Sequence, residues 1–223
     1  MVRSFFHLVD DGTLGPAFLR AMEDLFLGYT LAVVVGITLG ILMGRHRTVE
    51  RVMAPYVTFF QATPIIALTP LLVIWFGLGI KAEVAIVFLL SVWTIIINTC
   101  EGVKSVPPIM LDMARIYHVP ERKIVRKIAI PNAVPYIFAG LNIAIAKGLI
   151  GMIIGGMDIS LRGLGGLVST FGDDFQTSSL LAAVICSSLV GVILTVLINL
   201  ARRTFAPWSI AVQVKAVKGG KAR

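Results

Sequence analysis

The sequence predicts an all-α integral membrane protein with about five transmembrane helices and a pair of short helices held in water on one side of the membrane. Of its 223 residues, 57% are apolar and 14% are charged, and the mean hydropathy is +0.90. Soluble domains carry about 25% charged residues, so this composition is typical of a chain that lies mostly in lipid. The net charge of +8 does not indicate a nucleic-acid partner, because basic residues between long apolar runs mark membrane orientation.

Intervals without charge locate the spans, because about 20 apolar residues cross the hydrocarbon core. The second interval is longer than one span needs and contains three prolines, which predicts an entry segment followed by a kinked or tilted helix. The fourth is interrupted only by Lys147. Residues 158–174 are rich in glycine and charge and favour an extramembrane loop or a short re-entrant segment. The five expected spans are residues 25–44, 52–80, 84–100, 128–157 and 175–201.

Gly36, Gly40 and Gly44 recur at four-residue spacing along the first expected span. Small residues on one stripe of a helix allow a second helix to approach closely. We expect this stripe to pack against another helix of the same subunit, and a seam between two subunits is the alternative.

Basic residues gather on one side of the expected spans. The opposite loops contain Lys81 and Arg162, where acids outnumber them. By the positive-inside rule the basic side is cytoplasmic, and five spans then place the N-terminus outside. The expected organisation is an extramembrane or interfacial segment at residues 1–24, a transmembrane domain at 25–205 and a basic cytoplasmic tail at 206–223. The cytoplasmic set holds 15 of the 20 basic residues, namely Arg45, Arg47, Arg51, Lys104, Arg115, Arg122, Lys123, Arg126, Lys127, Arg202, Arg203, Lys215, Lys218, Lys221 and Arg223.

A charged island at residues 104–127 separates the third and fourth expected spans. Its pattern predicts a helix at 109–116, a turn at 117–120 and a second, basic helix from Glu121. Ionised groups cost several kcal/mol each in hydrocarbon, so this helix pair must stand in the cytosol. A structured pair there favours the docking of a soluble protein, and a solvated basic loop without a partner is the alternative.

Residues at fixed spacing in the island form a recognisable pattern: Asp112, Met113, Ala114, His118, Ile128, Ile130 and Pro131. This pattern resembles the EAA loop of ABC importer permeases, which reads Glu-Ala-Ala, then a glycine four residues after the last alanine, then Ile-x-Leu-Pro. Further matching segments lie at residues 61–64, 70–79, 102–108 and 131–137, so the resemblance extends over almost the whole chain. They are similar to the branch of binding-protein-dependent permeases for sulfonates, taurine, nitrate, bicarbonate and pyrimidine precursors.

The resemblance implies a type I ABC importer-like transmembrane domain whose coupling helix lies in residues 104–131. Such a chain is the permease subunit of an ATP-driven importer in the bacterial inner membrane, and its solute is small and anionic or polar, of the sulfonate, nitrate, bicarbonate or pyrimidine-precursor type. The implied partners are two ATPase subunits, a second permease copy or a paralogue, an extracytoplasmic substrate-binding protein and membrane lipid. ATP and Mg are expected on the ATPase, so this chain is not an enzyme and holds no cofactor.

The resemblance also implies roles for single residues of the island. Asp112 and Arg115 would make polar contacts in a groove of the ATPase, and Ala114 would allow close approach. The two isoleucines and the proline that end the pattern would fix the island to the fourth span and convert a push into rotation of a helix. The implied ATPase-coupling residues are Asp112, Met113, Ala114, Arg115, His118, Ile128, Ile130 and Pro131.

The sequence departs from the family pattern in three places. His118 stands at the usual glycine position, so a residue other than glycine must adopt the left-handed backbone conformation, and Pro120 is expected to start the second helix. Relatives often carry an arginine near Asn142 and a glutamate near Gly156, and both are absent here. Many relatives also have a span before residue 25 that this sequence does not show.

Lys147 is the sharpest candidate for a contact with the solute, because it lies 16 residues beyond Pro131 within the fourth expected span. An intramembrane cation beside an aqueous path would favour an anionic solute, and structural pairing with a carbonyl or an acid is the alternative. Four polar residues are expected along the same path, with interhelical hydrogen bonds as the alternative for each. They are Gln61, Thr63, Asn98 and Asn142.

The sequence contains no pattern typical of a catalytic or metal site. It has no glycine-rich phosphate loop ending in Lys-Ser or Lys-Thr, so ATP must be hydrolysed by another chain. No His, Cys or carboxylate cluster has metal-ligand spacing. An ion-coupled secondary carrier, one alternative function, would need acids inside the membrane, and the expected spans lack them. A membrane scaffold that recruits soluble proteins without transport is the other alternative.

Overall fold

The computed structural model describes residues 12–205, and every regular element in this range is helical. The expected tail at 206–223 and residues 1–11 of the expected N-terminal segment lie outside the described residues. The elements in chain order are α2 (Leu14–Arg45), α3 (Arg47–Ala62), η1 (Ile65–Leu68), α4 (Thr69–Phe76), α5 (Ile80–Lys104), α6 (Pro108–Ile116), α7 (Glu121–Ile124), η2 (Val125–Ala129), α8 (Ile130–Gly155), η3 (Gly156–Ser160), α9 (Gly163–Asp173) and α10 (Thr177–Phe205).

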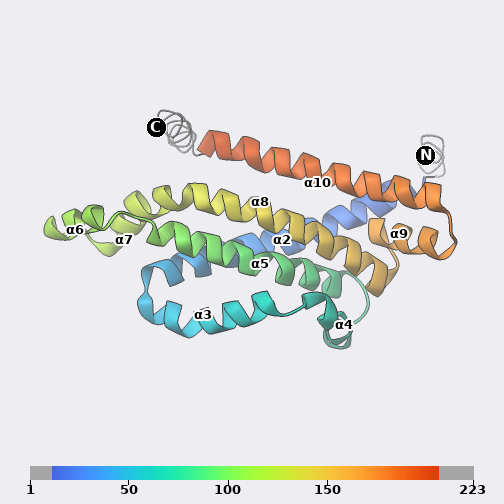
Figure 1. The fold of residues 1–223 in the computed structure, drawn as a ribbon, viewed down its shortest axis with the longest axis horizontal. Coiled ribbons are helices and arrows are strands. Elements are labelled where there is room, and N and C mark those ends of the chain that lie inside the picture. Colours follow the sequence, from blue (N-terminus) through green and yellow to red (C-terminus); the bar gives the residue numbers. More distant parts are fainter. Residues whose placement is uncertain (1–11, 206–223) are drawn as a thin grey trace, which may run out of the picture.

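Four long apolar stretches of helix can each cross a membrane. They are α2, α5, the stretch Glu121–Ser160 that contains α8, and α10. They form an elongated bundle, from one end of which α6 and α7 project (Figure 1). The α3 helix and the η1–α4 segment qualify only as a bent pair, with 89° between them. Counted as one span, this pair brings the total to the expected five. Because α2 begins at Leu14, helical structure starts before residue 25, and the membrane boundary at residue 25 stays a prediction.

The glycine stripe of α2 packs against α5, which lies at the centre of the bundle between α2 and α8. A Cβ built on Gly36 would lie 2.8 Å from the Cβ of Ile95, and one built on Gly40 would lie 2.5 Å from the Cβ of Thr99. Real Cβ atoms do not approach so closely, so only glycine permits this helix spacing. The expectation that the stripe packs within one subunit is confirmed.

The second expected span is interrupted at Thr63 and Pro64. Thr63 is extended, with φ −71° and ψ 131°, as residues before proline usually are, and Pro64 has no N–H to continue the helical hydrogen bonds. Pro55 is accommodated inside α3, and Pro70 lies in the first turn of α4. The expected kinked helix is therefore two helices with a break at Pro64.

Residues 158–174 were expected to form an extramembrane loop or a short re-entrant segment, and within them Gly163–Asp173 form the short helix α9. Leu161 adopts a left-handed conformation with φ 51°, the chain reverses there, and α9 then packs beside α2 and α10. A Cβ built on Gly156 would lie 2.8 Å from the carbonyl oxygen of Arg162 and 3.1 Å from the Cα of Gly165. The backbone therefore folds back on itself at glycines, and this packing leaves no room for the glutamate that relatives carry near Gly156.

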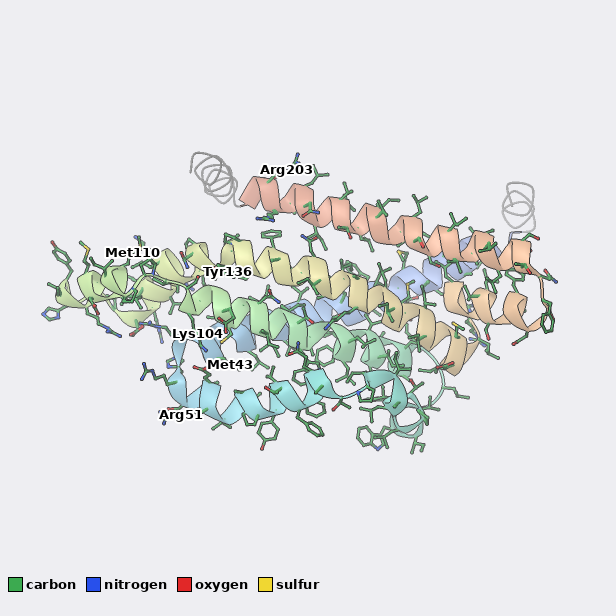
Figure 2. The ribbon with its side chains drawn as sticks, in the orientation of Figure 1. Met43, Arg51, Lys104, Met110, Tyr136 and Arg203 are labelled. Carbon is green, nitrogen blue, oxygen red and sulfur yellow. The ribbon has the colours of Figure 1, made fainter. Side chains whose placement is uncertain are left out.

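Basic side chains mark the end of the bundle from which α6 and α7 project. Figure 2 shows Arg51, Lys104 and Arg203 there, on the same half of the molecule as Met110 of α6. The α4 and α9 helices lie toward the opposite end (Figure 1). We call the basic end the cytoplasmic end and the other the outer end, in agreement with the positive-inside rule.

Candidate functional site

The helix pair at the cytoplasmic end is closed by a well-formed turn after α6. The N–H of Val119 donates to the carbonyl of Ala114 at 2.9 Å, and the N–H of His118 donates to the carbonyl of Arg115 at 2.9 Å. These two bonds form the Schellman motif that ends many helices. His118 occupies its left-handed position with φ 51°, and Pro120 directly precedes α7. The expected left-handed backbone at His118 is confirmed.

The inner face of the pair joins a hydrophobic cluster with the spans. Leu111 of α6 and Ile128 of η2 pack with Val103 near the end of α5 and with side chains of α8. Ile130 begins α8, and Pro131 lies in its first turn. Packed side chains therefore connect α6 to α8, through the segment that the resemblance marked for this role.

The outer face of α6 exposes a row of apolar side chains. Ile109, Met110, Met113, Ile116 and Tyr117 are 68%, 52%, 54%, 74% and 77% exposed. We call these five residues the apolar stripe. The sequence-based assignment includes Met113 and omits the other four, although their helical spacing is a signal that could have found them. Exposed apolar surface of this kind in water is typical of a protein docking site.

Asp112 and Arg115 flank the apolar stripe and are exposed. Nη1 of Arg115 donates to Oδ1 of Asp112 at 3.4 Å. Ala114, in contrast, is only 7% exposed. Its carbonyl accepts the hydrogen bond from Val119, and the expected role of Ala114 in close approach to a partner stays a prediction.

Two ion pairs connect helix ends near the α6–α7 helix pair. Arg45, the last residue of α2, donates from Nε to Oε2 of Glu121 at 2.8 Å and from Nη2 to Oε1 at 2.6 Å. Nζ of Lys104 donates to Oε1 of Glu50 at 2.5 Å. Exposed ion pairs contribute little to stability. Their main effect here is on geometry, since they fix the start of α7 to α2 and the end of α5 to α3.

A pocket of about 240 Å³ between α3–η1, α5 and α8 is a second candidate site. It lies at the break between α3 and η1, where Gln61 and Thr63 line it together with Lys147 of α8. The ring of Phe60 stacks on Trp93 in its wall, with the ring centroids 4.9 Å apart. Irregular backbone at membrane depth is tolerated where it lines a cavity. The fold therefore brings three of the expected path residues together at such a cavity.

Lys147 has a hydrogen-bond partner but no counter-ion among residues 12–205. Its ammonium donates to the Thr94 hydroxyl at 2.9 Å, and none of the ion pairs of the described residues includes it. Thr94 lies ten residues before Lys104, the end of α5, which is about 15 Å of helix and close to the middle of a hydrocarbon core about 30 Å thick. An ammonium has three donors, so this site can accept an anion from the pocket.

The other two expected path residues lie outside the lining of this pocket. Asn98 donates to the Thr94 carbonyl within α5 at 2.8 Å, and a Cβ built on Gly140 of α8 would lie 2.7 Å from its Cβ. Asn142 donates to Oδ1 of Asn199 on α10 at 2.8 Å. Asn142 thus forms the interhelical hydrogen bond that was the alternative to a place on the path. Asn98 lies at the close contact between α5 and α8.

Two acids that directly precede expected spans are buried in the bundle. Asp24 and Glu83 are 6% and 5% exposed and line one pocket at the outer end of α2 and α5. The sequence placed both outside the lipid, because local hydropathy does not show that a second helix covers them. Because both acids lie outside the expected spans 25–44 and 84–100, the expectation that those spans lack acids stays a prediction.

Comparison with known proteins places the chain among transport permeases. Residues 36–209 match the family described as binding-protein-dependent transport system inner membrane component. The bicarbonate transport system permease protein of Synechococcus elongatus is 33% identical over 170 residues, which cover 75% of this chain and 60% of that protein. The taurine transport system permease protein of Escherichia coli is 27% identical over 203 residues, 91% of this chain and 74% of that protein. The chain thus spans less than two thirds of the length of the bicarbonate permease.

Solved structures with the same fold are the membrane domains of ABC transporters. A chain of the MetNI methionine ABC transporter in an inward-facing conformation aligns with a TM-score of 0.73 and 18% identity, over 87% of this chain and 95% of its own. A chain of an amino acid ABC transporter aligns with a TM-score of 0.67 and 17% identity, over 91% and 97%. These similarities confirm the expected fold, that of a type I ABC importer transmembrane domain. Together with the family match over most of its length, they show that the chain belongs to the binding-protein-dependent transport system inner membrane components.

Proposed function

We propose that this chain is the permease subunit of an ATP-driven importer that receives its solute from an extracytoplasmic binding protein. ATP and Mg would be bound by two separate ATPase subunits, and a second permease copy or a paralogue would complete the pathway. Family membership and the permease names of the relatives support this assignment. The observation that carries it is the apolar stripe of α6, which is exposed in water while the inner face of the same helix packs against the spans.

The coupling step in this proposal is a rigid movement of α6 transmitted to α8. The ATPase would bind the apolar stripe, with Asp112 and Arg115 at its border. Leu111 and Ile128 share one cluster, so a displacement of α6 moves the start of α8. The same helix carries Lys147 into the intramembrane pocket. A push at the cytoplasmic end can therefore change the pocket at membrane depth.

The coupling is tested by replacing Asp112 and Arg115 together with alanine, and separately by Met113→Glu in the apolar stripe. Both variants should insert in the membrane, because all three side chains are exposed, yet ATP hydrolysis by the reconstituted ATPase should no longer drive uptake. Arg203→Ala is the matched control, since it removes an exposed cation at the same end of the bundle but on α10. Undiminished uptake in the first two variants would contradict docking at α6.

A small anion is the solute class that the pocket supports best. The Lys147 ammonium is a fixed positive charge beside a broken helix, and Gln61 and Thr63 add hydrogen-bonding groups to the same lining. Three relatives are named for bicarbonate, taurine and nitrate transport. A charge-assisted hydrogen bond to the anion would contribute about 1.5–3 kcal/mol.

The solute assignment is tested by measuring uptake of bicarbonate, nitrate and taurine by the reconstituted importer. Lys147→Met should weaken apparent affinity for the transported anion by roughly tenfold to a hundredfold, and Lys147→Arg should restore much of it. Lys81→Met, which removes an exposed cation at the outer start of α5, is the control and should leave affinity unchanged. Equal uptake by Lys147→Met and the parent protein would show that Lys147 has only a structural role.

A further inference from the structure

The seam between α2 and α5 repeats with a constant offset, and two acids form its outermost layer. Gly28 meets Val87 and Gly40 meets Thr99, and in both cases the second number exceeds the first by 59 (87 − 28 = 59 and 99 − 40 = 59). The two helices are therefore parallel and in register. Asp24 lies one turn before Gly28, and Glu83 lies one turn before Val87. These two acids have the same offset (83 − 24 = 59).

The two carboxyl groups are buried against each other. Asp24 is 6% exposed and Glu83 is 5% exposed, and both side chains line the same pocket at the outer end of the seam. Among residues 12–205, neither acid takes part in a salt bridge within 4 Å. Two carboxylates held in the same layer of a poorly hydrated seam would repel each other, because both are acceptors only, and one proton between them removes this repulsion.

The helix ends favour one position for that proton. Glu83 lies in the first turn of α5, where the unpaired N–H groups of the helix terminus stabilise a negative charge. Asp24 lies in the interior of α2, eleven residues after Thr13, which precedes the helix, and so lacks this stabilisation. The proton therefore belongs on Asp24, which then donates to the Glu83 carboxylate.

A pocket of about 220 Å³ connects this pair to other elements of the outer end. The charged side chains that line it around the pair are Arg20 and Glu23 from α2 and Arg162 from the segment before α9. The α8 helix faces Glu83 with a glycine, Gly155, which brings no charge. Among the described residues, Arg20 and Arg162 line the same pocket but form no salt bridge with the two acids.

We infer that Asp24 and Glu83 hold one shared proton and act as a clamp that joins α2 to α5 at the outer end of the transmembrane domain, with the strength of the clamp set by pH. This role is separate from the import function proposed above. The folded protein binds a proton that the exposed carboxyl groups of the unfolded chain release at neutral pH. Stability must therefore decrease as pH rises through the titration of the pair. When the proton is lost, two negative charges face each other and the outer ends of the two helices separate.

The clamp is tested by the apparent Tm of the purified chain in detergent between about pH 5 and about pH 9, a window above the usual range of carboxyl titration. Asp24→Asn keeps a donor for the Glu83 carboxylate but carries no titrating proton, so its Tm should change less across this window than that of the parent protein. Asp174→Asn is the matched control, because it removes an exposed acid of the outer end that does not line this pocket and should keep the parent's dependence on pH. Parallel profiles for the parent protein and Asp24→Asn would overturn the inference.

Infrared spectroscopy provides a test that does not depend on how well a variant folds. The parent protein at neutral pH should show the carbonyl stretch of one protonated carboxyl group, and the band should disappear in alkaline buffer together with the loss of Tm. Its absence from the parent protein at neutral pH would overturn the inference. Where Asp24→Asn folds, the band should be missing from it and present in Asp174→Asn.

Discussion

Replacing Gly40 by alanine tests the seam that organises the bundle. The new Cβ would lie 2.5 Å from the Cβ of Thr99 and 2.8 Å from the carbonyl oxygen of Ile96. Ordinary contacts begin near 3.4 Å, so the two helices must separate by about 0.9 Å at this level (3.4 − 2.5 = 0.9). Neither neighbour can rotate away, because one is a Cβ and the other a backbone oxygen. Overpacking of this kind costs roughly 1–3 kcal/mol.

Gly15→Ala provides the matched control on the same helix. A Cβ built on Gly15 meets nothing within 4 Å. Alanine is a better helix former than glycine by up to about 1 kcal/mol, and both variants gain this helix-propensity contribution to stability. The difference between them therefore isolates the contact with α5.

The measurement is the apparent Tm of the purified chain in detergent. In a domain of this size a change of 1 kcal/mol shifts Tm by about 2–4 °C, so Gly40→Ala should melt roughly 2–12 °C below Gly15→Ala. Equal Tm values for the two variants would refute the close α2–α5 contact and, with it, the register on which the Asp24–Glu83 layer depends.

Two further predictions concern the helix pair at the cytoplasmic end. His118→Gly should raise stability by up to about 1 kcal/mol, because glycine adopts the left-handed conformation without the steric cost that other residues meet, and His118→Val should lower it; a less stable glycine variant would contradict the observed turn. A double-mutant cycle on Arg45→Ala and Glu121→Ala should give a coupling of about 0.2–1 kcal/mol that falls as salt is added, since Glu121 is 63% exposed. A coupling that does not change with salt would mean that the pair is shielded from solvent.

Local patterns predicted most of the architecture. The spans, the orientation and the turn at His118 depend on composition, charge and turn chemistry within short windows of sequence. The helix pair was expected from residue 109 and from Glu121, and α6 and α7 form there. The glycines at positions 36 and 40 predicted a close helix contact, and the structure identifies α5 as the partner.

Local patterns do not show an environment that is set by an element far away in the chain. The sequence placed Asp24 directly before the first expected span, and in the fold α5 covers its side chain. Ala114 is buried, which its neighbours in the sequence do not show. Residues 158–174 favoured a loop or a short re-entrant segment, and the glycines that usually mark loops are the residues that permit α9 to pack closely.

The sequence by itself determined that this chain is a multi-span membrane protein with a water-exposed helix pair, because lipid and water impose hydropathy and charge patterns that can be read residue by residue. Only the tertiary structure decided which side chains meet. It placed Lys147 beside Gln61 and Thr63 at a broken helix, and Asp24 and Glu83 in one pocket. The physical reason is that burial and pairing depend on two segments that come into contact. The sequence of one segment does not show which other segment will cover it.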